Sequence, residues 1–505
     1  MLKPSAEDEM KANARLGDSS NFQTLKSTFI MGGSSIINIV LGIIRNKVIA
    51  LLLNPAGMGL TGLYQSISNL ACTISGMGIN ESGARQVAIA FQDGNESVIS
   101  RTSRSLRRIA FLTGIVGTAV LLLLSKWVGF FTFHNNEHTI DIALLSLTIL
   151  FFTISGGQLA LIQGARKIPY LANVNMLGPL WGTLLSLPII YFLGVRGIVS
   201  YLIIMSGTSM AASWWYSRKI RIVEEKTSWH DSFIDAKPLM SLGAALMVGT
   251  IIGYGTPYFL RILLIRFLGL DAVGEFQAAS ILSTVYVGIL FKAMATDFYP
   301  RLSAASRSDV ESCLLVNEQI EAGLLLAIPG VLITLTFAPL VMIIFYSSKF
   351  LPAVDVLRWQ VLGVLLQVIT WPMGYVLRAK AAGGLFVVTE LFASISYLVG
   401  TWVGIRQFGL PGIGAAFFVY NILYFILIYR IVHVKYKFAF LKNNVQVLVL
   451  AFILTGAVLL TTYFSPRYSL LINIALTIAA CLYSYKKLAF SHWIARFVNA
   501  LKRKG

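Results

Sequence analysis

The chain has 505 residues, of which 56% are hydrophobic and 12% are charged, and its mean hydropathy is +0.74. Water could not keep a surface of this composition in solution, so a soluble protein is excluded and a polytopic membrane protein is predicted. We attribute the net charge of +19 to membrane topology and not to nucleic-acid binding, because the basic residues gather in the segments between apolar runs.

The N-terminal segment, residues 1–25, is polar and mixed in charge. It lacks the basic start, apolar middle and small-residue cleavage site of a signal peptide, so we expect the first membrane span to direct insertion. Cys72 and Cys481 lie in apolar runs and Cys313 lies in a predicted loop. This distribution indicates no disulfide framework.

Apolar runs of about 20 residues, long enough to cross the hydrocarbon core of a bilayer, follow one another along the rest of the chain. Charged stretches or stretches rich in Gly and Pro separate them. The predicted fold is therefore an all-α polytopic membrane protein with about 14 transmembrane helices. The predicted spans are residues 28–53, 58–80, 109–131, 139–163, 171–193, 197–217, 239–265, 272–296, 321–346, 354–377, 385–404, 411–432, 446–464 and 468–485.

Two halves of this pattern resemble each other. Gly62-Leu-Tyr-Gln65 begins the second span, and Gly274-Glu-Phe-Gln277 begins the eighth. The mixed-charge loop 218–238 falls between the halves and is the expected cytoplasmic linker. We therefore predict two six-helix bundles related by a pseudo-two-fold axis along the membrane normal, with a substrate site between them. The predicted division is residues 1–25 (cytoplasmic segment), 26–217 (first bundle), 218–238 (linker), 239–432 (second bundle), 433–485 (two additional spans) and 486–505 (basic amphipathic cytoplasmic tail).

Most basic residues between spans fall on the side that holds both termini. The positive-inside rule then places both termini in the cytoplasm. Two basic groups are interpreted mainly as topology anchors that contact anionic lipid headgroups. They are Arg101, Arg104, Arg107 and Arg108 in one loop and Arg218, Lys219 and Arg221 in another.

Arginines lie inside two apolar runs, at corresponding places in the two halves: Arg45 in the first span and Arg261 in the seventh. A guanidinium within the bilayer costs several kcal/mol, so such a residue usually faces a polar cavity or a partner. At 1.5 Å of rise per residue, both lie about 10 Å or more from the outer helix end. This pair predicts a transporter with an anionic substrate.

Other charged residues in spans are weaker candidates. Lys47 and Arg266 are predicted substrate contacts that could equally extend to lipid headgroups, and Lys292 lies near the inner end of the eighth span. Carboxylates in spans serve either as structural salt bridges or as cation and proton sites. The candidates for ion coupling are Glu275, Asp297 and Glu390.

Catalytic and metal-binding motifs are missing from the sequence. It contains no P-loop, no zinc-type histidine spacing and no nucleophile elbow. We therefore predict that the protein is not an enzyme, has no ATPase of its own, and binds neither a metal nor a cofactor.

One run carries a family resemblance: Ile43-Ile-Arg-Asn-Lys-Val-Ile-Ala-Leu-Leu-Leu-Asn-Pro-Ala-Gly-Met-Gly-Leu-Thr-Gly-Leu-Tyr-Gln-Ser-Ile67, followed by Gly78-Ile-Asn-Glu-Ser-Gly-Ala-Arg-Gln-Val-Ala88. It resembles the O-antigen translocases, the Wzx-type polysaccharide flippases of the multidrug/oligosaccharidyl-lipid/polysaccharide exporter superfamily. Similarity in span order extends over about the first 430 residues. Many flippases of this type have 12 spans. In its predicted number of 14 spans, this chain resembles the lipid II flippase branch instead.

The resemblance implies translocation of an undecaprenyl-diphosphate-linked oligosaccharide from the inner to the outer leaflet of the bacterial inner membrane, by alternating access. It also implies membrane lipids, a polysaccharide polymerase and a chain-length regulator as partners. Because the sequence has no ATPase motif, the driving force is expected to be an ion gradient (H⁺ or Na⁺), the membrane potential or consumption of the product outside. Three alternatives stay open: a lipid II-type flippase, a drug/cation antiporter of the same superfamily, and a membrane polysaccharide polymerase. A cation antiporter would be expected to have more buried carboxylates than buried arginines, whereas the deep charges here are mainly basic. A polymerase would be expected to have large periplasmic loops, and none is predicted here.

Overall fold

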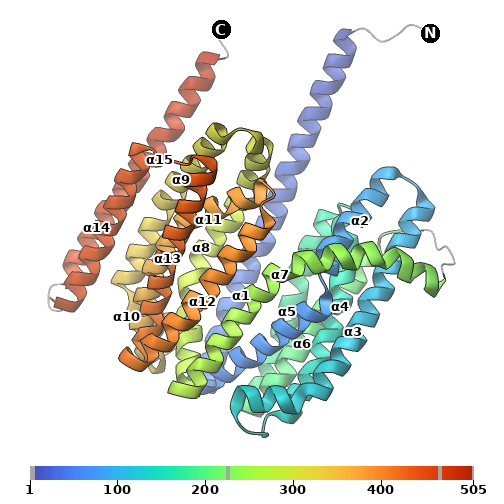
Figure 1. The fold of residues 1–505 in the computed structure, drawn as a ribbon, viewed down its shortest axis with the longest axis horizontal. Helices are drawn as coiled ribbons and strands as arrows, with labels where there is room; N and C mark the ends of the chain where they lie inside the picture. Colours follow the sequence, from blue (N-terminus) through green and yellow to red (C-terminus); the bar gives the residue numbers. More distant parts are fainter. Residues whose placement is uncertain (1–5, 223–227, 465–468, 503–505) are drawn as a thin grey trace. The chain divides into compact units, whose positions relative to one another are not determined.

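The computed structural model describes residues 6–222, 228–464 and 469–502, with the side chains of several helical stretches left out. The described part contains fifteen α-helices, three short 3₁₀ helices and no strand, which confirms the predicted all-α class (Figure 1). The α-helices are α1 (Ala6–Gly76), α2 (Ile79–Asp93), α3 (Glu96–Phe133), α4 (Thr139–Gly164), α5 (Ile168–Leu193), α6 (Gly197–Ser217), α7 (Trp229–Leu268), α8 (Leu270–Ala304), α9 (Asp309–Thr336), α10 (Ala338–Phe345), α11 (Val354–Ala379), α12 (Gly383–Phe408), α13 (Leu410–Tyr436), α14 (Lys442–Phe464) and α15 (Ser469–Lys502).

The helices fit a bilayer by length and by side-chain distribution. Eleven stretches within the described residues are apolar and long enough to cross a membrane, and two of them, Gly32–Gly76 and Ile168–Ser217, each contain two predicted spans. The predicted span 272–296 lies in α8, outside those eleven. Leu123 and Phe192 are 78% and 80% exposed, as side chains that face lipid would be.

Two predicted spans are interrupted. The predicted span 321–346 forms two helices, α9 and α10, which meet at Phe337. The predicted span 58–80 ends at Gly76, where Met77 and Gly78 take positive φ values and α2 begins. A proline near the start of α10 and the left-handed residues before α2 explain these breaks, because neither continues a helix.

A break in α1 separates the first two predicted spans. Within α1, Asn54 leaves the helical conformation (φ 59°, ψ −174°) immediately before Pro55. Proline disfavours a helical residue before it, and Asn tolerates positive φ better than most residues do. One long run of helix is thereby divided into two.

Two compact units make up the chain: unit 1 (Met1–Leu52 and Tyr64–Tyr254) and unit 2 (Leu53–Leu63 and Gly255–Gly505). Unit 1 extends past the predicted linker 218–238 to Tyr254, and unit 2 includes the segment Leu53–Leu63. The predicted division into two six-helix bundles therefore stays a prediction.

Unit 1 is built on helix pairs. α3 packs against α4, α5 against α6, and α4 also contacts α2 and α6. Small residues permit this close approach: a Cβ at Gly114 would lie 2.2 Å from Oγ1 of Thr153. Membrane helices commonly pack through glycine in this way, because lipid offers no hydrophobic drive between helices.

Unit 2 has α11 at its centre, packed against α8, α9 and α13. The two additional helices, α14 and α15, both pack against α9. Buried Asn317 on α9 holds the start of α14 in place: its Nδ2 donates to the carbonyl of Ala439 (2.9 Å) and its Oδ1 accepts from Nδ2 of Asn444 (2.9 Å). The backbone of α15 continues without a break into the predicted tail as far as Lys502, where its side chains lie outside the described residues.

Candidate substrate and coupling sites

Arg45 lies on α1 in unit 1 and is surrounded by neutral groups. Its Nη1 donates to the sulfur of Met205 on α6 at 3.8 Å, and its guanidinium lies near the hydroxyl of Tyr201. Its Nε is buried without a hydrogen-bond partner. No described carboxylate forms an ion pair with it, so the charge is held in the unit without neutralisation.

Arg261 lies on α7 in unit 2 and has a similar environment. Nη2 donates to Oε1 of Gln277 on α8, and Nη1 donates to the carbonyl of Pro257 at 3.1 Å. Its Nε is again buried without a partner, and the described residues provide no carboxylate for it. An unmade hydrogen bond of a buried donor costs about 1–3 kcal/mol. Both arginines therefore retain donors and charge that an anion could satisfy.

The neutral shell of Arg261 continues inward through polar side chains. Tyr397 of α12 lies beside the guanidinium and near Gln360 of α11. Gln360, only 1% exposed, donates to Oγ of Ser280 at 3.0 Å. Such a shell orients the arginine without cancelling its charge.

The other predicted basic contacts differ in position. Lys47 is half-buried on α1 and Arg266 is exposed near the end of α7, and each makes further polar or electrostatic contacts. The side chain of Lys292 lies outside the described residues. Their predicted roles stay predictions.

The three candidate coupling carboxylates have three different environments. Glu275 is half-buried on α8, with Asp271 as its charged neighbour. Asp297 is exposed near the end of α8 and forms a 3.1 Å salt bridge with Arg301, which also pairs with Glu318. Glu390 of α12 is half-buried and lies near Tyr424 and Arg378.

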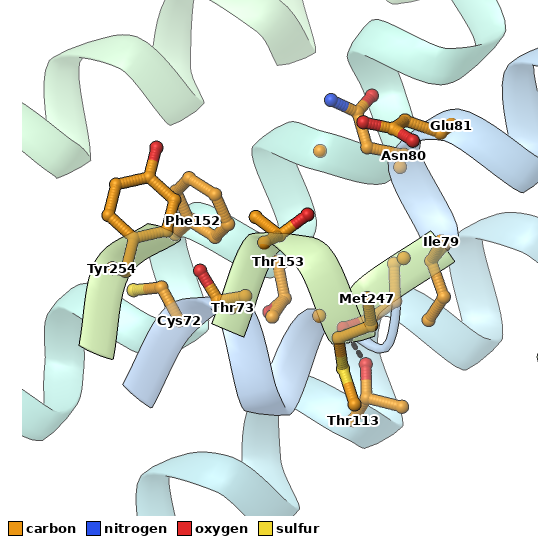
Figure 2. A pocket seen from close by; sticks show the side chains of 16 residues that line it. Cys72, Thr73, Ile79, Asn80, Glu81, Thr113, Phe152, Thr153, Met247 and Tyr254 are labelled. Carbon is orange, nitrogen blue, oxygen red and sulfur yellow. Dashed lines mark hydrogen bonds between the residues drawn. The ribbon is translucent and has the colours of Figure 1, made fainter. Parts of the chain in front are cut away.

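Unit 1 contains a cavity of about 210 Å³, lined by α1, α2, α3, α4 and α7. In the view of Figure 2, the rings of Phe152 and Tyr254 lie at one end, and the side chains of Asn80 and Glu81 lie at the other. Four threonines also contribute to the lining: Thr73, Thr113, Thr153 and Thr250. Asn80 and Glu81 belong to the sequence run that resembles O-antigen translocases, so this run lines a cavity.

Unit 2 contains a second cavity of about 290 Å³ between α11, α12 and α13, with Phe291 of α8 on its wall. Its lining combines Glu390 and Arg378 with amide, hydroxyl and aromatic side chains. The sequence analysis identified Glu390 but missed Arg378, because at the helix end Arg378 is indistinguishable from a topology anchor.

The two basic groups interpreted as topology anchors come together in unit 1. Arg104 and Arg107 of α3 and Arg218 and Arg221 line one cavity of about 390 Å³. Arg218 also stacks on Trp214, with 3.7 Å from Cζ to the ring centroid. More than 100 residues separate the two groups in sequence, so only the fold could reveal this cluster.

Comparisons with known proteins agree with this architecture. Residues 24–306 match the family model described as polysaccharide biosynthesis protein. The chain is 22% identical over 423 residues to the lipid III flippase of Escherichia coli (strain K12), covering 80% of this chain and 96% of that protein. It is 24% identical over 424 residues to the lipopolysaccharide biosynthesis protein WzxC of the same organism, covering 80% of each chain.

Solved structures share the fold at 14% sequence identity. The lipid II flippase MurJ in an inward closed conformation gives a TM-score of 0.71 and covers 92% of this chain and 100% of its own. An inward-facing multidrug resistance MATE transporter of the MOP superfamily gives 0.69, covering 79% and 94%. The fold is thus that of a polytopic, all-helical membrane protein. The chain belongs to the polysaccharide biosynthesis protein family, in agreement with its resemblance to Wzx-type flippases.

Proposed function

We propose that this protein moves an undecaprenyl-diphosphate-linked oligosaccharide, an O-antigen or related repeat unit, from the cytoplasmic to the periplasmic leaflet of the bacterial inner membrane. One observation carries the proposal: Arg45 and Arg261 each hold an unsatisfied, buried Nε and have no described carboxylate partner. The flippase names of the two relatives from Escherichia coli and Shigella flexneri support the same class of substrate.

The diphosphate accounts for the arginines. A guanidinium presents several N–H donors in a planar fork, and it forms two parallel charge-assisted hydrogen bonds to a phosphate group. A site with little water strengthens each of these bonds. Arg45 and Arg261 are the proposed principal contacts, with Lys47, Arg266 and Lys292 as additional ones.

Transport in this proposal proceeds by alternating access. The phosphates neutralise the arginines, the glycan occupies a wet cavity, and the polyprenyl chain stays in lipid. A coupling ion, H⁺ or Na⁺, would act at Glu275, Asp297 or Glu390. A polysaccharide polymerase and a chain-length regulator are the proposed partners that use the product outside.

The decisive test is translocation of lipid-linked oligosaccharide in proteoliposomes. Arg45→Ala and Arg261→Ala are expected to lower the rate at least about tenfold, equivalent to about 1.4 kcal/mol. Arg45→Lys and Arg261→Lys retain the charge but lose the fork, and we expect an intermediate rate. Arg406→Ala is the matched control, because Arg406 stacks on Trp402 (4.2 Å) near a helix end; its rate should equal that of the wild type.

Unchanged rates in both alanine variants, at normal protein level, would contradict the phosphate contact. Export of organic cations without movement of the lipid-linked glycan would instead support an antiporter of the same superfamily.

A further inference from the structure

The cavity of unit 2 between α11, α12 and α13 has the size of a site for a single small ring. Its volume of about 290 Å³ is at the lower limit for small-molecule pockets, which span roughly 300–1,000 Å³. An oligosaccharide would not fit inside it, but one monosaccharide residue of a longer chain would.

Aromatic rings form one part of the wall. Trp371 stacks on Phe291 with 4.9 Å between ring centroids and 4° between ring planes, and Tyr375 lies 4.3 Å from Trp371. These contacts fix the rings in place before any ligand enters. A fixed aromatic wall offers apolar contact to the C–H groups of a sugar ring at little cost in side-chain entropy.

A buried amide forms another part. Asn421 of α13 is 1% exposed and lines the cavity. Its Nδ2 donates to the carbonyl of Phe417 at 2.7 Å, and its Oδ1 has no hydrogen-bond partner. An unpaired buried acceptor is costly, so Oδ1 indicates that a donor from a ligand completes this site.

Charged groups supply further donors and acceptors. Arg378 is held between the rings of Phe386 (4.3 Å) and Tyr375 (5.1 Å), and it donates no hydrogen bond to the described residues. Glu390 and Tyr424 also line the cavity, and the carboxylate of Glu390 can accept from a ligand. The cavity thus combines donors, acceptors and an aromatic wall.

We propose that this pocket binds one pyranose ring of the lipid-linked glycan, and this inference rests on the proposed function. Hydroxyl groups donate to Oδ1 of Asn421 and to Glu390, and they accept from Arg378. A hydrocarbon would leave these groups without hydrogen-bond partners, and the positive charge of Arg378 would repel an organic cation. The pocket therefore recognises the glycan, whereas Arg45 and Arg261 contact the diphosphate.

The test compares two lipids in proteoliposomes: the lipid-linked oligosaccharide extracted from cells that carry this chain, and undecaprenyl diphosphate without a glycan. Asn421→Leu keeps the side-chain volume and removes the amide. Trp371→Phe reduces the aromatic surface that the cavity wall offers to a sugar ring. We expect each variant to slow the glycan-bearing lipid at least about tenfold and the bare lipid less than about twofold. Arg261→Ala should slow both lipids.

Trp359→Phe is the matched control, because Trp359 lies on the same helix and packs against Phe418 (5.8 Å) outside the pocket; it should leave both rates unchanged. Equal effects of Asn421→Leu and Trp371→Phe on the two lipids, or no effect on either, would overturn the sugar site while leaving the flippase proposal intact. Failure of the wild-type protein to move either lipid would instead refute the proposed function, and the sugar site with it.

Discussion

Arg261 donates a hydrogen bond from Nη2 to Oε1 of Gln277, the last residue of the Gly274-Glu-Phe-Gln277 run. The acceptor is an amide and not a carboxylate, so the arginine is oriented while its charge is retained. In a transporter for an anion this distinction matters, because an internal carboxylate would compete with the substrate for the guanidinium.

Gln277→Glu is expected to abolish most transport. The new carboxylate would form an ion pair with Arg261 at the site of the present hydrogen bond, and a phosphate would then have to displace it. We expect at least a tenfold loss of translocation rate at a normal level of protein in the membrane. Gln277→Ala, the control, frees Nη2 without neutralising it and should cost less than about fivefold; wild-type transport by Gln277→Glu would argue against a phosphate at Arg261.

Gly274→Ala is expected to destabilise unit 2. A Cβ at Gly274 would lie 1.9 Å from the carbonyl oxygen of Pro55, so α8 and the segment around Pro55 would have to separate. Overpacking of this kind costs about 1–3 kcal/mol, measurable as a lower melting temperature in detergent. Gly288→Ala on the same helix is the matched control, because nothing lies within 4 Å of its added Cβ; similar melting temperatures for the two variants would refute the close contact.

Asn317→Ala is expected to loosen α14 from α9. The substitution removes the bonds to Ala439 and Asn444 and leaves the backbone N–H of Leu441 (3.0 Å from Oδ1) without its acceptor. The loss should be about 2–3 kcal/mol. Thermal unfolding in detergent measures it, with Asn443→Ala as the control, because that substitution removes only exposed bonds to Glu321 and Lys487, which contribute about 0–1 kcal/mol. Equal stability of the two variants would contradict this anchoring role.

Among the candidate coupling carboxylates, Glu390→Gln is expected to lower transport more than Asp297→Asn. Glu390 is half-buried beside a cavity, whereas the Asp297 side chain is 72% exposed and already paired with Arg301. Exposed pairs of this kind contribute about 0–1 kcal/mol, so we expect less than a twofold effect from Asp297→Asn and at least fivefold from Glu390→Gln. The measurement is the initial translocation rate with and without an imposed ion gradient. A larger effect of Asp297→Asn than of Glu390→Gln would indicate a coupling site on α8 instead.

Arg301 should make a contribution to stability that does not change with pH in the physiological range. Hydrogen bonds and charges from Asp297 and Glu318 raise the pKa of Arg301 above its ordinary value. A raised pKa gives stability that is fully present below the unfolded-state pKa and is lost only as the pH rises through the folded-state value. The drop in melting temperature caused by Arg301→Met should therefore be the same at about pH 6 and about pH 9; a clear difference would mean that another group titrates in this cluster.

The sequence alone was sufficient for the class of fold. Long apolar runs can satisfy their backbone groups in lipid only as helices, so the spans follow from hydropathy, and the break at Asn54 and Pro55 follows from backbone sterics. Arg45 and Arg261 could likewise be selected from sequence, because a charge far inside an apolar run is costly wherever the helix packs.

The tertiary structure decided which side chains surround those charges. Gln277, Tyr201 and Tyr397 are ordinary residues of membrane helices, and no local pattern distinguishes a neighbour of an arginine from a residue that faces lipid. The pocket of Arg378, Glu390 and Asn421 is a similar case, because it is assembled from three helices whose rotations about their own axes are set by packing with neighbours. Hydropathy determines that a segment crosses the membrane, but only the contacts between helices determine which of its faces lines a cavity.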